Sequence, residues 1–124
     1  MSENLTHHPV WELIDGILVV NLDTSTERME TFREVNALKL PWEKVSRLSA
    51  VLGRALPTYG QRPWFTESTG ERARFWGGTA GCALSHRKAI EQAKAEGWRN
   101  VLILEDDAHV TSGKKELDFL QDLL

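Results

Sequence analysis

Two runs of large aliphatic residues without polar interruption are the clearest pattern along the chain, I-L-V-V at 17–20 and V-L-I-L at 101–104. A run without alternation is typical of a strand whose two faces are both covered, and its β-branched residues favour strand over helix. Both runs are therefore predicted to be buried strands, and the second is predicted to be a central strand of a parallel sheet. The more mixed pattern at 45–50 predicts a third strand.

Helical spacing of apolar residues follows the first strand and predicts a helix over residues 25–38, stopped by Pro41. Thr24 and Glu27 have the form of a capping box at its start. A second helix is expected to begin near 79–81 and to end at Gly97, with a stripe that points His86 inward among small residues. Strand, helix and strand in this order predict an α/β fold with a mostly parallel central sheet flanked by helices.

The remaining segments carry weaker patterns. Residues 1–14 are expected to be an N-terminal tail, and residues 53–78, rich in glycine and proline, a long loop. In that loop Arg62, Arg72 and Arg74 can meet phosphate oxygens or simply be solvated. Residues 109–124 are expected to form an amphipathic C-terminal helix. The whole chain, 1–124, is predicted to be a single domain.

Composition narrows the function classes. With 41% hydrophobic residues, 27% charged residues and a net charge of -3, the chain has the composition of a globular protein and no basic footprint for nucleic acid. No apolar run approaches the ~20 residues of a transmembrane helix, and the first residues do not resemble a secretory signal, so a cytoplasmic protein is expected. The single cysteine, Cys82, excludes an internal disulfide framework and a zinc site built from several cysteines.

Candidate chemistry lies where the strand 101–104 ends, at Glu105, Asp106 and Asp107. In open α/β sheets, ligands bind beyond the carboxyl ends of the strands. Three adjacent carboxylates repel one another unless a cation or a proton relieves them, and their hard oxygens suit Mg²⁺ or Mn²⁺ together with substrate phosphates. The sequence therefore predicts a metal site here, with a solvated acidic turn as the alternative.

The turn after the first strand offers a second candidate. Asn21, Asp23 and Ser25 precede a helix N-terminus, where free N–H groups favour anions such as diphosphate, although Asp23 can instead cap the helix. Ser85 and His86 are neighbours on a helix and do not face each other, so they do not form a catalytic pair. On an apolar face His86 is more often a core residue than a catalyst.

Three separated segments together resemble glycosyltransferase family 25, the enzymes of lipooligosaccharide biosynthesis and the related collagen galactosyltransferases. They are V-V-N-L-D-T-S-T-E-R-M at 19–29, G-C-A-L-S-H-R-K-A at 81–89 and V-L-I-L-E-D-D-A at 101–108. The resemblance implies a GT-A-like (Rossmann-like) nucleotide-sugar fold, with residues 15–108 as the donor-binding core. It implies transfer of a hexose to a saccharide acceptor in lipopolysaccharide or lipooligosaccharide biosynthesis. The expected hexose is galactose, the expected donor is UDP-galactose, and the transfer is expected to invert the anomeric configuration.

The resemblance also implies roles for particular residues. Asp107, with Glu105 or Asp106, would hold Mn²⁺ or Mg²⁺ against the donor phosphates. The nucleotide end of the pocket would be lined by Asn21, Asp23 and Arg28, and Ser85 and His86 would lie near the donor or behind the metal strand.

The chain departs from the family pattern in length, because family members continue beyond the acidic motif with segments that bind the acceptor and supply the catalytic base. The expected fold is therefore truncated at its C-terminus, the catalytic base is unassigned, and a donor-binding or interaction domain without turnover is an alternative. A further alternative is a receiver-like Mg²⁺-binding signalling domain, which V-L-I-L-E-D-D also resembles. Exposed sheet edges and apolar surface would favour a homo-oligomer.

Overall fold

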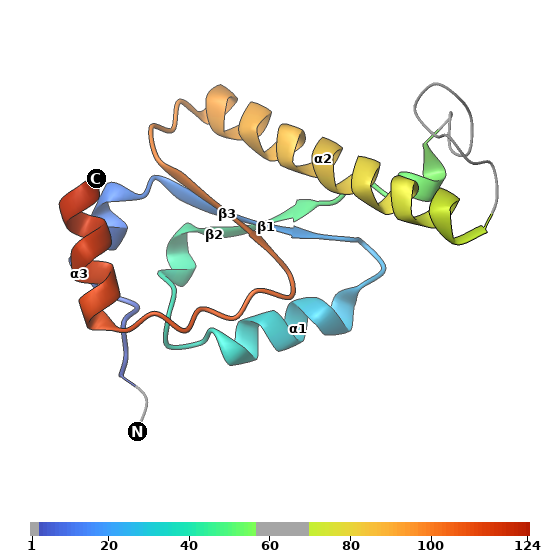
Figure 1. Cartoon of the computed structure of the whole chain (residues 1–124). Coiled ribbons are helices and arrows are strands. Elements are labelled where there is room, and N and C mark those ends of the chain that lie inside the picture. Colours follow the sequence, from blue (N-terminus) through green and yellow to red (C-terminus); the bar gives the residue numbers. More distant parts are fainter. Residues whose placement is uncertain (1–2, 57–69) are drawn as a thin grey trace.

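Three parallel strands form one sheet in the order β2-β1-β3, with a helix after each strand (Figure 1). The computed structural model describes residues 3–56 and 70–124, and within 70–77 only the helical backbone. The strands are β1 (Gly16–Asn21), β2 (Val45–Ser49) and β3 (Val101–Glu105), and the α-helices are α1 (Thr26–Val35), α2 (Gly70–Glu96) and α3 (Lys114–Leu123). Short 3-10 helices are η1 (Pro9–Leu13), η2 (Trp42–Lys44) and η3 (Gly53–Ala55). The predicted α/β fold with a parallel sheet flanked by helices is confirmed.

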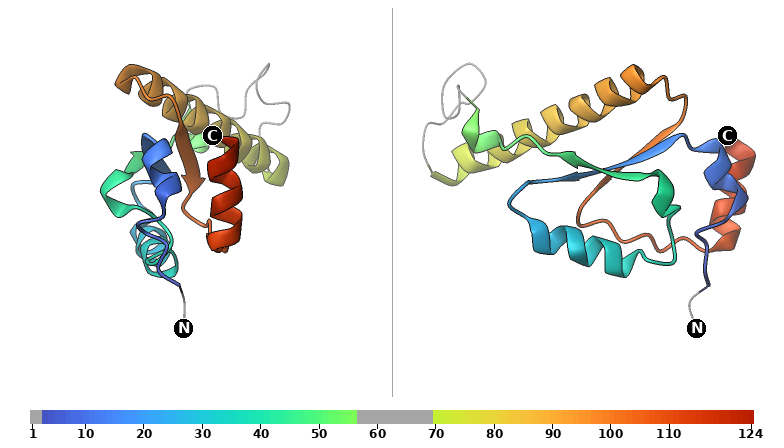
Figure 2. Two further views of the ribbon diagram at one scale, coloured as in Figure 1. Left: turned by 90° about the vertical axis from the view of Figure 1, so that its left-hand side faces the viewer. Right: turned by 180° about the vertical axis from the view of Figure 1, so that it is seen from behind.

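Both faces of β1 are covered, and all six of its residues are buried. Ile17 and Val19 pack in a cluster with Phe32 of α1 and Leu117 of α3. Leu18 and Val20 point to the opposite face and pack in a second cluster, with Ala89 of α2. Helix α2 accordingly lies on one side of the sheet, and α1 and α3 lie on the other (Figures 1 and 2). This arrangement explains the apolar run at 17–20 without alternation.

The strand at 101–104 was predicted to be central, and that prediction is wrong within the described residues. Strand β1 occupies the centre, and β3 pairs only with β1 and is partly exposed along Val101–Leu104. Its side chains still alternate between the two clusters, with Leu102 and Leu104 on the α1 side and Val101 and Ile103 on the α2 side. An apolar run reports that both faces of a strand are covered, and it does not report how many of its edges are paired.

The helices differ from their predicted bounds. Helix α1 begins at Thr26, and its N-cap residue is Ser25 and not Thr24, so the capping box predicted for Thr24 and Glu27 does not form. Ser25 itself makes no side-chain capping hydrogen bond. Helix α2 begins at Gly70, and residues 70–78 are therefore helical where a loop was expected. Glycine weakens a helix but does not break it as proline does. The rest of the predicted loop, 57–69, lies outside the described residues, as does Arg62, and the side chains of Arg72 and Arg74 are not described.

The ends of α2 and α3 follow their sequence signals more closely. Helix α2 ends at Glu96, and Gly97 takes a φ of 75°, the left-handed conformation that favours glycine after a helix. Helix α3 covers Lys114–Leu123 within the predicted 109–124, and it packs through Leu117 and Leu120. No helix of the described residues is both long enough and apolar enough to span a membrane.

The predicted N-terminal tail is instead packed against the body of the protein from residue 5 onward. Leu5, Val10 and Trp11 are buried in the cluster on the α1 side of the sheet. His8 accepts a hydrogen bond from the backbone N–H of Val10 at Nδ1, and its Nε2 lies 2.7 Å from a carboxylate oxygen of Asp118 in α3. The segment before β1 is therefore held to α3 by both apolar and polar contacts.

Candidate functional site

A polar hollow of about 300 Å³ lies at the carboxyl ends of the strands, between α2 and the start of α1. Of the eight site residues predicted from the sequence, six line it, and Asp23 and His86 do not; the six are Asn21, Arg28, Ser85, Glu105, Asp106 and Asp107. A larger hollow of about 680 Å³ lies between β3 and α3, but no Asp or Glu side chain lines it. The polar hollow is the candidate site because it combines the strand ends with charged side chains.

Asn21 joins the ends of all three strands. Its side chain is buried, and its Nδ2 donates to Asp106 Oδ2 at 2.8 Å and to the carbonyl oxygen of Ser25 at 3.0 Å. Its Oδ1 accepts from Arg47 Nε of β2 at 2.8 Å. All the polar atoms of this amide are therefore engaged, and its main role in the described structure is to fix Asp106 and the start of α1.

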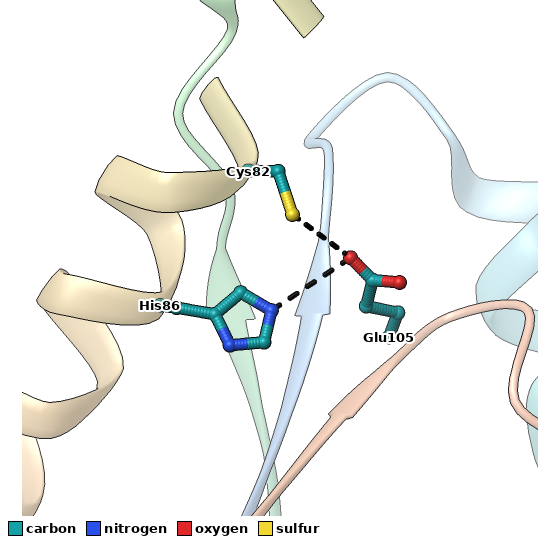
Figure 3. A group of neighbouring side chains, drawn as sticks. All are labelled: Cys82, His86 and Glu105. Carbon is teal, nitrogen blue, oxygen red and sulfur yellow. Dashed lines mark hydrogen bonds and ion pairs between the residues drawn. The ribbon is translucent and has the colours of Figure 1, made fainter. Parts of the chain in front are cut away.

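The acidic segment divides at the end of β3. Asp106 is 9% exposed, and its second oxygen forms an ion pair with Arg28 at 2.6 Å, so both of its oxygens have partners. Asp107 is 69% exposed and lies 4.0 Å from the same guanidinium. Glu105 points toward α2 (Figure 3). The three carboxylates therefore do not converge on one point in this structure.

This division follows from the alternation of side chains along a strand. Glu105 continues the series of Val101 and Ile103, which face α2, whereas Asp106 continues the series of Leu102 and Leu104, which face α1. Arg28 comes from α1 and therefore meets Asp106.

Asp23 has a different environment from the one predicted. Its carboxylate forms an ion pair with Arg47 and accepts a hydrogen bond from Ser49 Oγ at 2.7 Å. The hydrogen bond from Arg47, followed by the one from Ser49, lowers the pKa of this carboxyl below its ordinary value. Asp23 does not cap α1, because its observed partners belong to β2. It lies outside the hollow and fixes β2 to the turn after β1.

Ser85 connects α2 to the chain that follows β2. Its buried hydroxyl donates to the carbonyl oxygen of Gly81 at 2.6 Å and accepts from the backbone N–H of Val51 at 2.8 Å. A Cβ atom at Gly81 would lie 2.7 Å from the carbonyl oxygen of Val51, so α2 approaches this segment closely at a position where only glycine fits without a shift. Ser85 therefore positions one wall of the hollow.

His86 does not point into the core as predicted. In the part of α2 whose side chains are described, the buried positions are Gly81, Ser85, Ala89 and Ala93, so Ser85 takes the inward position expected for His86. The His86 side chain is 41% exposed. It faces Glu105, with 3.7 Å between Nε2 and Oε1 (Figure 3).

Cys82 faces the same carboxylate from one helical turn earlier. Its thiol donates to Glu105 Oε1 at 3.2 Å (Figure 3). The hydrogen bond to Glu105, aided by burial and by the negative charge of that carboxylate, raises the pKa of the thiol. Sequence reasoning missed this neighbour of Glu105. The only signal for it is the spacing of Cys82 and His86, four residues apart on one helix.

A parallel sheet with an acidic, arginine-containing hollow at its strand ends defines an α/β protein of the kind that binds ligands beyond its strands. Residues 14–123 match glycosyltransferase family 25 (LPS biosynthesis protein), and the chain belongs to this family. No curated protein and no solved structure matches the chain. The match assigns the acidic strand to a glycosyltransferase family and disfavours the receiver-domain alternative.

Proposed function

We propose that this chain binds a nucleotide-sugar in the hollow at its strand ends and transfers a hexose from it to a saccharide acceptor in lipopolysaccharide or lipooligosaccharide biosynthesis. Family membership supports glycosyl transfer. The observation that carries the location is that Arg28, Asp107 and the start of α1 all lie at one hollow beside the acidic strand end. We further propose a GT-A-like fold and UDP-galactose as the donor, which the resemblance of the three sequence segments implies.

The donor diphosphate has suitable partners there. Arg28 is 56% exposed while it holds Asp106, so part of its guanidinium remains accessible to phosphate oxygens. Ser25 makes no side-chain capping hydrogen bond, which leaves N–H groups of the first turn of α1 open to an anion. The carboxylate of Asp23 already binds Arg47 and Ser49 of β2, so Asp23 would contribute by fixing the conformation of the turn after β1.

A divalent cation would also fit this hollow. Mg²⁺ and Mn²⁺ commonly take one or two carboxylates and complete their coordination with water and substrate phosphates. Asp107 and Glu105 are 69% and 52% exposed, so their oxygens are accessible, whereas both oxygens of Asp106 are engaged. We therefore propose Asp107 as the protein ligand, with Asp106 as a positioning residue, because Glu105 points toward α2 instead. The cation would neutralise charge on the leaving nucleoside diphosphate.

Calorimetry with UDP and UDP-galactose, with and without Mn²⁺, tests this proposal. Wild type should bind UDP in a Mn²⁺-dependent manner, and Asp107→Ala should lose most of that binding without loss of fold, because its side chain is exposed. Glu91→Gln is the matched control, an exposed acid on α2 outside the hollow. The proposal fails if no UDP-sugar binds, or if Asp107→Ala binds as wild type does.

A second candidate is donor binding without transfer. The outer edge of β3 is unpaired among the described residues, and the large apolar hollow adjoins this strand, so a further polypeptide can be accommodated there. Donor hydrolysis distinguishes the two candidates. Release of hexose that requires both Mn²⁺ and Asp107 supports an enzyme, and UDP-sugar binding without release supports a binding or interaction domain.

A further inference from the structure

Three potential metal ligands of different chemistry converge beside the hollow. Cys82 and His86 lie one turn apart on α2, and Glu105 is the last residue of β3. Their ligand atoms all lie within 4.8 Å of one another (Figure 3). Within the ranges 3–56 and 78–124, whose side chains the structure describes, this is the one group of three or more Cys, His, Asp or Glu residues with such spacing.

The spacing is close to what a tetrahedral zinc ion requires. Zinc binds sulfur at about 2.3 Å, and nitrogen and carboxylate oxygen at about 2.0 Å, so tetrahedral angles place sulfur and oxygen about 3.5 Å apart and nitrogen and oxygen about 3.3 Å apart. The observed distances are 3.2 Å between Cys82 Sγ and Glu105 Oε1, and 3.7 Å between His86 Nε2 and the same oxygen. These two pairs would need to shift by about 0.4 Å or less. The sulfur of Cys82 and the ligand nitrogen of His86 lie within 4.8 Å of each other, and tetrahedral zinc would bring them to about 3.5 Å.

Ligand chemistry selects the metal. A thiolate and an imidazole are poor ligands for Mg²⁺ but suit zinc, which accepts mixed sulfur, nitrogen and oxygen sets. A thiolate and a carboxylate would balance the two charges of the ion, and the proton that the thiol now donates to Glu105 would leave to solvent. His86 and Glu105 are 41% and 52% exposed, which leaves access for an ion and room for a fourth ligand.

We propose that Cys82, His86 and Glu105 form a binding site for a single Zn²⁺ ion, with its fourth position open to water or another ligand. Cys82 and Glu105 line the hollow at the strand ends, so the ion would lie in the wall of that hollow. The site is distinct from the proposed Mn²⁺ or Mg²⁺ position in requiring Cys82 and His86 and in not requiring Asp107. It does not rest on the proposed function, because ion binding is measured without a donor.

Cobalt titration of the reduced chain gives a direct test, with Co²⁺ as a spectroscopic substitute for Zn²⁺. We expect one Co²⁺ per chain, with ligand-field bands of four-coordinate cobalt and a thiolate-to-cobalt charge-transfer band, all abolished by added Zn²⁺. Because the chain has a single cysteine, the charge-transfer band reports Cys82 alone.

Substitutions then assign the other ligands. Cys82→Ser should abolish the charge-transfer band, and His86→Ala should weaken binding by at least about 10–100-fold, the loss known for residues that merely hydrogen-bond a ligand. Asp107→Asn and Glu91→Gln should bind Co²⁺ as wild type does, and circular dichroism confirms that each variant is folded. Absence of the bands in wild type, unchanged binding in His86→Ala, or an equal loss in Asp107→Asn would overturn the proposal. Any of these results would leave Mn²⁺-dependent UDP binding, and with it the proposed function, to be judged separately.

Discussion

The contact between Asn21 and Asp106 should be one of the most sensitive points of the fold. Asn21→Asp keeps the shape of the side chain but replaces a donor NH₂ group with an acceptor oxygen. The hydrogen bond to the carboxylate of Asp106 and the one to the carbonyl oxygen of Ser25 are both lost. A hydrogen bond to a charged group contributes about 1.5–3 kcal/mol and a neutral one about 0.5–1.5 kcal/mol, so their loss costs about 2–4.5 kcal/mol.

Charge repulsion adds to this cost. Two carboxylate oxygens at the observed 2.8 Å would repel one another by about 6 kcal/mol at an effective dielectric constant of about 20. Arg47, which already donates to Asn21 Oδ1, would offset part of this repulsion. We therefore expect Asn21→Asp to lower the free energy of unfolding at neutral pH by at least about 4 kcal/mol, a large part of the usual 5–15 kcal/mol.

Exchanging the donor and the acceptor should restore stability. In the double variant Asn21→Asp/Asp106→Asn, the amide at 106 can donate to the carboxylate at 21, and the ion pair lost at Arg28 is inexpensive because that side chain is 56% exposed. The double variant should be at least about 2 kcal/mol more stable than the sum of the single variants implies. Asn36→Asp is the matched control, because Asn36 is equally buried but has no carboxylate partner, and Asp106→Asn should not rescue it.

Urea unfolding followed by circular dichroism at pH 7 measures all of these variants. With a slope of about 2 kcal/mol per molar urea, a loss of 4 kcal/mol lowers the midpoint by about 2 M. The reasoning is refuted if Asn21→Asp costs less than about 1 kcal/mol, or if the double variant is as unstable as the two single changes added together.

Two further predictions concern stability. Gly81→Ala should destabilise the fold by about 1–3 kcal/mol, because the new methyl group would lie 2.7 Å from a backbone oxygen after β2. Gly78→Ala on the same helix meets no atom within 4 Å and should stabilise it by about 0.5–1 kcal/mol, and equal effects in thermal unfolding would contradict this reasoning. Asp15 has a lowered pKa because the backbone N–H groups of Asn100 and Arg99 donate to it. A lowered pKa contributes stability above the unfolded-state value, which is lost as pH falls through the folded-state value, so Asp15→Asn should flatten the acid limb of a pH series of urea midpoints.

The strands were the most predictable part of the fold, because the residues of a strand alone indicate whether both of its faces are buried. The run at 17–20 has no polar position, and β1 is indeed covered on both faces. The place of a strand within the sheet depends instead on pairing between distant segments, and the equally apolar run at 101–104 lies beside β1 at an edge of the described sheet. The start of α2 was missed because Gly77 and Gly78 resemble a loop signal, although the helix continues through them.

The candidate site was predictable to the extent that parallel strands bring their carboxyl ends together. That rule alone placed Asn21 and the acidic segment at one hollow. Arg28 and Ser85 were expected there only from the family resemblance, and the two flanking helices bring them to it. The roles of the individual side chains were harder to predict from the sequence. Asp23 looked like a helix cap in the sequence, yet its partners are Arg47 and Ser49 of β2, which only the register of β1 against β2 could reveal.

The acidic segment shows how far the alternation of a strand can be used. Glu105, Asp106 and Asp107 appear in the sequence as one cluster, but adjacent residues of a strand point to opposite faces, so Glu105 and Asp106 cannot share their partners. The α1 side supplies Arg28 and Asn21 to Asp106, and the α2 side supplies Cys82 and His86 to Glu105. A single motif thus serves two environments, one in which a carboxylate is neutralised and held in place and one in which a carboxylate joins a thiol and an imidazole. The second environment is the reason to test zinc separately from manganese, because only the ion that prefers sulfur and nitrogen should depend on α2.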